Sequence, residues 1–236
     1  MFECFRNYRW RLVCGGSLIV LAFFSGCDSG RHESNEQKTT SVVDAATSLF
    51  DGKTLSPWKP TNFGGEGDIT VVDGELKMEM GYPMTGVTWD GFEIPKQNYE
   101  ISLEARRDDG VDFFCGLTFP VKESHCSLIV GGWGGTLLGL SCIDGFDASE
   151  NATTQFLEFD DNRWYKIRVK VSESTITVWL DDKEVVHQQL EGHEISLRNE
   201  TLPCRPLGIC CFETVCRYRN VKLTRYMAES SDAEKK

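Results

Sequence analysis

Apolar and polar residues alternate one by one along several short stretches of this chain. Between Tyr99 and Arg106 every second residue is apolar, and the same period recurs over residues 165–171 and 175–180. Successive side chains of an extended strand point to opposite faces, so this period predicts strands that cover a core with one face. No segment shows helical periodicity over more than about two turns.

Turn signals separate these stretches at short intervals. Asp73-Gly74 lies between residues 69–72 and 75–80, and this dipeptide accepts the positive φ of a tight hairpin. About a dozen short strands joined in this way are typical of a sandwich or a barrel, so the pattern predicts an all-β domain. The remaining strands are expected at residues 87–94, 112–120, 126–131, 137–143, 154–159, 183–190, 206–212 and 216–226.

The first 27 residues have the features of an export signal. Three arginines within residues 6–11 precede an apolar run over 12–24, and Ser25-Gly26-Cys27 follows. The run is too short to span a hydrocarbon core of about 30 Å, which favours a cleaved signal peptide. Its ending resembles a bacterial lipobox and predicts a lipoprotein of the bacterial cell envelope, anchored to the membrane at Cys27 and facing the periplasm or the cell surface. An ordinary signal peptide followed by a chance cysteine is the alternative.

The rest of the chain divides by composition. Residues 28–47 are polar and lack periodicity, which predicts a flexible linker, and residues 227–236 form a similar polar tail. Residues 48–226 are then one folded domain, a size common for β-sandwiches.

Charge narrows the choice of partners. The net charge is −11, and no cluster of lysine or arginine occurs beyond the first dozen residues. A protein that binds nucleic acid usually presents a basic face, so no nucleic-acid partner is expected. An acidic surface is compatible with neutral ligands such as sugars.

Seven cysteines fall within the predicted domain. Export permits disulfides, but an odd number leaves at least one thiol free. Consecutive hairpins would place Cys115, Cys126 and Cys142 in a row across one sheet, whereas a register slip would separate them. Most of the seven are interpreted as small core residues: Cys115, Cys126, Cys142, Cys204, Cys210, Cys211 and Cys216.

Several motifs, in order, resemble those of the 3-keto-disaccharide hydrolase-like domain. The matching segments are Ser48 to Trp58 (opening L-F-D-G), Val72 to Leu76 (D-G-x-L), Tyr99 to Arg106, Trp164 to Val186, and Tyr218 to Val221. The resemblance covers almost the whole predicted domain. It implies a concanavalin A-like jelly-roll sandwich of two antiparallel sheets and membership of a carbohydrate-active group.

The centre of the domain departs from the family pattern. The polar E-x-Q-x-x-D set of the enzymes is not visible, and residues 108–117 and 125–130 stand in its place. The resemblance therefore implies activity as a hydrolase of 3-keto-disaccharides or related glycosides, without assigning its residues. A non-catalytic, lectin-like carbohydrate-binding module is the alternative.

One acidic loop offers carboxyl groups for such chemistry. Glycoside hydrolysis generally uses two carboxyl groups, and Asp144 and Asp147 are the candidate catalytic pair, with Glu150 close by. Asp residues also form turns through their own backbone, which is the alternative reading. The same oxygens could hold Ca²⁺, but the spacing is not that of an EF-hand, so no metal or cofactor is predicted.

Ligand contacts are expected from a small set of residues. Trp133 lies between glycine pairs, and its indole could stack on a sugar ring or fold back onto the core. His125, Arg106 and Asn151 complete the predicted ligand-binding set. Two further tryptophans, at 164 and 179, fall on the face of their strands that points away from the core.

Overall fold

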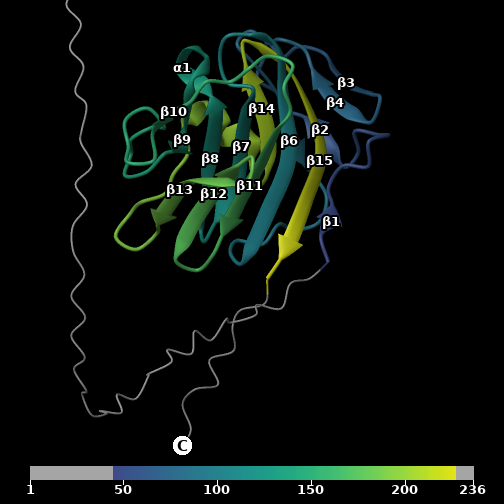
Figure 1. The fold of residues 1–236 in the computed structure, drawn as a ribbon. Helices are drawn as coiled ribbons and strands as arrows, with labels where there is room; N and C mark the ends of the chain where they lie inside the picture. Colours follow the sequence, from purple (N-terminus) through teal and green to yellow (C-terminus); the bar gives the residue numbers. More distant parts are fainter. Residues whose placement is uncertain (1–44, 227–236) are drawn as a thin grey trace, which may run out of the picture. The chain divides into compact units, whose positions relative to one another are not determined.

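The computed structural model describes residues 45–226, which form two antiparallel β-sheets packed face to face (Figure 1). One sheet has eight strands in the order β13-β12-β11-β6-β15-β4-β3, with β1 paired to β15. Its strands are β1 Thr47–Ser48, β3 Ile69–Val72, β4 Glu75–Met78, β6 Tyr99–Gly110, β11 Tyr165–Val171, β12 Thr175–Leu180, β13 Lys183–Gln189 and β15 Thr214–Arg225.

The second sheet has seven strands in the order β10-β9-β8-β7-β14-β5-β2. Its strands are β2 Trp58–Pro60, β5 Met84–Trp89, β7 Cys115–Val121, β8 Ser124–Gly131, β9 Leu137–Ser141, β10 Gln155–Phe156 and β14 Gly208–Phe212. The all-β jelly-roll sandwich predicted from the sequence is confirmed.

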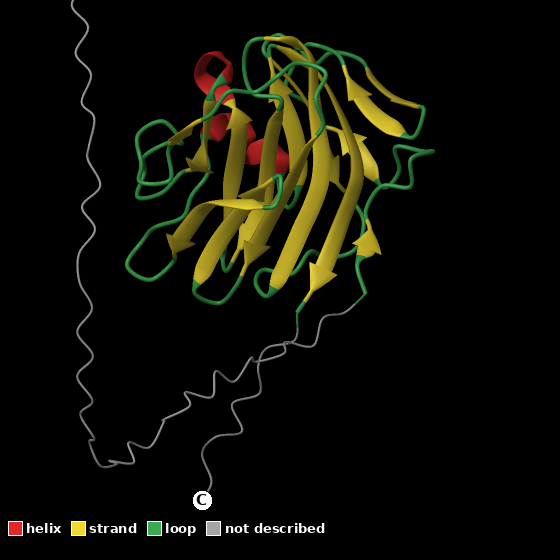
Figure 2. Cartoon of the chain, in the orientation of Figure 1, coloured by secondary structure: helices red, strands yellow, loops and turns green. Residues whose placement is uncertain are grey.

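Two short helical segments complete the described residues: α1 Gly132–Gly135 and the 3₁₀ segment η1 Asn199–Cys204. Figure 2 shows them in red, with α1 at the top of the view and η1 behind the strands of the sandwich. Within residues 45–226, neither is long and apolar enough to cross a membrane. The predicted leader with Cys27, most of the linker and the polar tail lie outside the described residues.

Period-2 alternation builds the core as expected. Along β6, Tyr99, Ile101, Leu103 and Ala105 are buried between the sheets, while the residues between them are only partly buried. The outer tryptophans are covered by arginines: the guanidinium of Arg219 lies 4.1 Å from the Trp164 ring, and a similar contact covers Trp179. Both therefore lie away from the core, as the alternation predicts.

Strand β5 differs from its expected span of 87–94. It begins at Met84 and ends at Trp89, because the chain turns back on itself immediately afterwards. The indole Nε1 of Trp89 donates a hydrogen bond to the carbonyl of Phe92 at 2.8 Å, and a side chain at Gly91 would collide with the Trp89 ring. These contacts end the strand.

All seven cysteines of the described residues are buried as free thiols, which agrees with their interpretation as core residues. The proposed row of three does not form. Cys115 pairs with Val130 and Cys126 with Phe119, so Cys115 and Cys126 lie well apart along the β7–β8 pair. The hairpin turns at Lys122 and Glu123, later than the row required, and this shifts the register.

Candidate functional site

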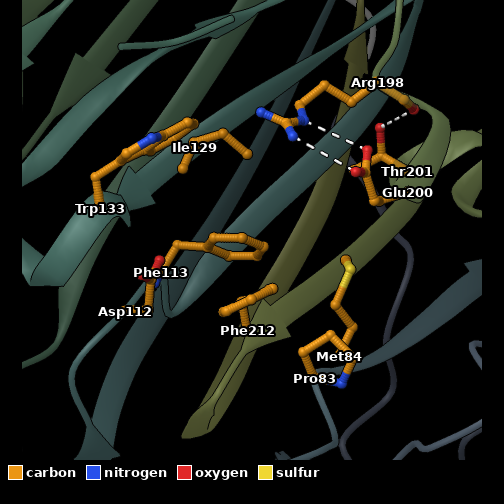
Figure 3. A pocket seen from close by; sticks show the side chains of 10 residues that line it. All are labelled: Pro83, Met84, Asp112, Phe113, Ile129, Trp133, Arg198, Glu200, Thr201 and Phe212. Atoms are coloured by element: carbon orange, nitrogen blue, oxygen red, sulfur yellow. Dashed lines mark hydrogen bonds and ion pairs between the residues drawn. The ribbon is translucent and has the colours of Figure 1, made fainter.

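A pocket of about 250 Å³ lies on the outer face of the seven-stranded sheet, the face that points away from the eight-stranded sheet. Its floor comes from the ends of β5, β8 and β14 and from the residues just before β7, and one wall comes from η1. Figure 3 shows the lining side chains: Pro83, Met84, Asp112, Phe113, Ile129, Trp133, Arg198, Glu200, Thr201 and Phe212.

The rest of this outer face is covered by the chain itself. The Thr118 and Ser127 hydroxyls of β7 and β8 bond each other at 2.8 Å and are buried, and Ser127 also contacts Thr201 of η1. Cys204, the last residue of η1, sits so close to Gly208 that a Cβ there would lie 2.6 Å from that of Cys204. The pocket is therefore the part of the face that η1 leaves open.

A second segment covers the β9 side of the same face. Ala148 packs against Gly139, where an added Cβ would lie 2.8 Å from the Ala148 carbonyl oxygen. The Oγ1 of Thr153 accepts a hydrogen bond from the amide of Leu140 at 2.9 Å. The loop of residues 144–154 is thus fixed on the sheet beside the pocket.

Trp133 reaches the pocket from an unusual turn. The backbone has φ/ψ of 50°/56° at Trp133 and 84°/23° at Gly134, so α1 is a left-handed turn rather than a right-handed helix. Glycine tolerates this region freely, which explains the glycine pairs around the tryptophan. The Asp112 carboxylate accepts a hydrogen bond from the Gly134 amide at 3.3 Å. The Trp133 side chain remains 44% exposed, so it does not fold back onto the core.

Two phenylalanines form the apolar base of the pocket. The rings of Phe113 and Phe212 lie 5.7 Å apart at an interplanar angle of 38°, and the Phe212 amide donates to the Phe113 carbonyl at 3.1 Å. Together with Trp133 they give the pocket three aromatic side chains. Flat, apolar rings of this kind provide a stacking surface for a ligand with an apolar face.

The polar wall combines a cation and a carboxylate. Arg198 lies within 3.4–3.5 Å of both Glu200 carboxylate oxygens (Figure 3). It also binds the Asp147 carboxylate at 2.7 Å. The hydrogen bonds from Arg198 hold the pKa of Glu200 below its ordinary value, and Glu200 in turn raises the pKa of Arg198. Thr201 is fixed by donating to the Arg198 carbonyl at 3.1 Å. The pocket therefore offers charged hydrogen-bonding groups opposite aromatic ones.

Of the residues predicted for the site, only Trp133 lines this pocket. Asp144 is exposed, accepts hydrogen bonds from His193 at 2.7 Å and from the Glu194 amide, and has its pKa lowered chiefly by the His193 contact. Asp147 contacts the pocket through its ion pair with Arg198. Neither carboxylate is part of the lining.

The other predicted ligand residues lie elsewhere. His125 lies on the same outer face, but it is four residues from Ile129, which is about 13 Å along β8. Burial, together with the positive charges of Arg205 and Lys96, lowers the pKa of His125. Arg106 lies on the outer face of the other sheet and binds Asp108. The structure does not bring either to the pocket.

Asn151 fixes its own loop. Its amide donates to the carbonyls of Leu140 and Asp147, both at 2.7 Å, and its Oδ1 accepts from the amide and hydroxyl of Thr153. Its polar atoms are thus committed to the fold, and its side chain is not part of the pocket lining.

Sequence reasoning missed most of the lining, above all Arg198, Glu200 and Phe212. Arg198 and Glu200 belong to a segment without hydrophobic periodicity. Phe212 is only the last residue of the strand predicted over residues 206–212. Among residues 45–226, no group of three or more His, Cys, Asp or Glu side chains could hold a metal ion.

Comparison with known proteins decides the family. The pattern of the 3-keto-alpha-glucoside-1,2-lyase-like domain matches residues 45–224. The chain belongs to this family. The match covers the whole sandwich and confirms the resemblance predicted from the motifs, and the family is carbohydrate-active. No curated protein matches the chain.

Solved structures with the same fold are distant in sequence. A Bacillus subtilis protein of unknown function with a galectin-like fold has 8% identity, a TM-score of 0.53, and coverage of 80% of this chain and 99% of that one. The Crh5 transglycosylase in complex with NAG has 10% identity, a TM-score of 0.52, and coverage of 79% and 85%.

A third similar structure is domain 4 of AbnA, an extracellular GH43 arabinanase from Geobacillus stearothermophilus, in complex with arabinotriose. It has 14% identity, a TM-score of 0.50, and coverage of 80% of this chain and 95% of that one. At these identities the three similarities establish the fold alone.

Proposed function

We propose that the outer-face pocket binds one sugar ring of a 3-keto-disaccharide or related glycoside, and that the protein cleaves the glycosidic bond of this ligand. The observation that carries the proposal is the pairing of three aromatic side chains with the Arg198–Glu200 pair in one pocket. Its volume of about 250 Å³ is below the range of sites for drug-sized ligands and suits a single ring.

Binding would use both walls. The apolar face of the sugar stacks on Trp133 or on the phenylalanine pair, and its hydroxyls bond Arg198, Glu200 and Thr201. This division between a stacking side and a hydrogen-bonding side orients the ring.

Cleavage would exploit the ketone of the ligand. A carbonyl at C3 acidifies the hydrogen on C2, so a base can remove that proton and leave an enolate whose charge rests on the C3 oxygen. The enolate then forms the C1–C2 double bond, the bond from C1 to the leaving oxygen breaks, and that oxygen takes up a proton. Glu200 and Asp112 are the pocket carboxylates that can accept the C2 proton, and Arg198 is the cation that stabilises the enolate.

The test is turnover of methyl 3-keto-α-glucoside and 3-keto-trehalose, followed by NMR. We expect Arg198→Met to reduce kcat/KM at least 100-fold. Of Glu200→Gln and Asp112→Asn, the variant that removes the catalytic base should reduce kcat/KM to the same extent. The matched control is Asp144→Asn, an exposed carboxylate outside the lining. Loss of activity in the control with full activity in the three pocket variants would move the chemistry to the acidic loop.

A second candidate function, sugar binding without catalysis, is favoured by a specific observation. Both pocket carboxylates already accept hydrogen bonds from the protein, Asp112 from the Phe113 and Gly134 amides and Glu200 from Arg198. Calorimetric binding of either 3-keto glycoside without any product would support this alternative.

We also propose that the protein works at the bacterial cell envelope, held by lipid on Cys27. The support is the leader sequence, with its basic start, short apolar run and Ser-Gly-Cys ending. Mass spectrometry of the protein isolated from its native membranes should find a chain that begins at a diacylated Cys27. An unmodified N-terminus at any other residue would contradict the anchor.

A further inference from the structure

The pocket is closed toward the centre of the sheet. The covering segment η1 is packed on the floor through Cys204 and Gly208, and the carbonyl of Pro203 accepts a hydrogen bond from Thr88 of β5 at 3.1 Å. Thr118 and Ser127, which lie beneath η1 on the same face, are almost fully buried. A sugar chain therefore cannot continue from the pocket across the sheet.

The pocket is also bounded on the β8–β9 side. Trp133 and its left-handed turn stand there, and the 144–154 loop covers β9 next to them. The opposite side is formed by Pro83 and Met84, at the start of β5. At this border Pro83 is exposed, and the residue before it also has its side chain in solvent.

That residue, Tyr82, is the most exposed large apolar side chain among residues 45–226, at 88%. Its backbone is nevertheless well fixed. The Tyr82 amide donates to the Gly65 carbonyl at 2.7 Å, and the carbonyl of Pro83 accepts from the Glu213 amide at 2.8 Å. An exposed aromatic ring on a fixed backbone, adjacent in sequence to two lining residues, is a contact surface for a sugar ring.

We propose that Tyr82 is a second subsite, on which the leaving sugar unit of a two-ring glycoside stacks while the first ring occupies the pocket. This inference rests on the proposed function and adds to it the path of the ligand: one ring enters the closed pocket and the next ring leaves over the β5 border. The protein then recognises the end of a short glycoside and not an internal unit of a polysaccharide.

The experiment compares one-ring and two-ring probes by calorimetry or by KM. Tyr82→Ala should weaken binding of 3-keto-trehalose about fivefold, the size expected of one aromatic contact, and leave methyl 3-keto-α-glucoside unchanged. Tyr82→Phe, which keeps the ring, should behave as the natural protein. The control is Phe92→Ala, an exposed aromatic beyond the other end of β5, which should affect neither probe.

The outcomes separate the two proposals. If the natural protein binds both probes and Tyr82→Ala leaves 3-keto-trehalose binding unchanged, or weakens both probes equally, the subsite is refuted while the pocket stands. If the natural protein binds neither probe, the proposed function fails, and the subsite fails with it.

Discussion

Trp133 is the residue whose position depends most directly on local sequence. Its positive φ is flanked by glycines at 131, 134 and 135 that also have positive φ, so the turn can form without strain at those neighbours. At Gly135 the fit is close as well, since an added Cβ would lie 3.0 Å from Arg107 Nη1 and 3.1 Å from the Val111 carbonyl oxygen. The glycine pairs thus present one large ring to the pocket.

Replacing this ring tests its role. Trp133→Ala should weaken binding of methyl 3-keto-α-glucoside about tenfold, through loss of one stacking wall, while the free energy of unfolding changes by less than about 1 kcal/mol because the side chain is half exposed. Calorimetry and urea unfolding measure the two effects. Trp133→Phe should retain most of the affinity. Unchanged binding in Trp133→Ala would exclude the ring from ligand contact.

Glu200 predicts a pH dependence. Hydrogen bonds from Arg198 lower the pKa of Glu200 from its ordinary value of 4.5, so the folded protein favours the ionised carboxylate. The Arg198–Glu200 ion pair is therefore fully present above pH 4.5 and is lost as the pH falls through the lower pKa of the folded state. Ligand affinity should therefore be constant from about pH 8 to pH 5 and fall below about pH 4.5. Titration calorimetry measures this, with circular dichroism to show that the fold persists. A Glu200→Gln variant that keeps the same acid limb would assign the effect to another group.

At the level of elements, the sheets and the covering segments differ in what holds them. Strands follow from alternation, which each stretch of sequence carries by itself. The covering segments depend on contacts between distant residues, such as Thr201 with Ser127 and Pro203 with Thr88. Their side-chain hydrogen bonds should therefore contribute to stability more than to ligand binding.

Asn151 provides the test at this scale. Asn151→Ala should lower the free energy of unfolding by about 2–3 kcal/mol, because two carbonyls and Thr153 lose partners in a partly buried loop. Affinity for methyl 3-keto-α-glucoside should stay within about twofold. Urea unfolding and calorimetry measure these values, and the exposed neighbour Glu150→Ala is the matched control. A large loss of affinity without loss of stability would restore Asn151 as a ligand-binding residue.

This difference between elements also explains how far sequence reasoning reached. Strands such as β6, β11 and β12 were predictable because a two-residue period identifies a strand with one buried face. Trp133 was predictable because glycine pairs indicate special backbone angles. Arg198 was not, because the chain between residues 195 and 207 has no periodicity and is held over the sheet by contacts of Thr201 with Ser127 and of Pro203 with Thr88. Phe212 was not, because it is only the last residue of a strand.

For the whole molecule, the chemical accessibility of the seven thiols of the described residues reports how tightly the two sheets pack. All are buried, and burial raises the pKa of the Cys126 thiol to about 12, so the reactive thiolate is scarce at neutral pH. Differential alkylation at pH 8, mapped by mass spectrometry, should label none of the seven in the native protein and all seven after denaturation. Native labelling of any of them at the denatured rate would show that the packing opens.

At the scale of the whole molecule, η1 limits how far a bound sugar chain can extend across the sheet. Beneath it lies a smooth band of small residues, with Thr118, Ser127 and Gly208 continuing directly from the pocket floor. A shorter connection between β13 and β14 would expose this band to solvent and turn the closed pocket into an open groove. Changing the length of one loop would thereby convert an end-recognising scaffold into one that grips the middle of long sugar chains, with both sheets left as they are.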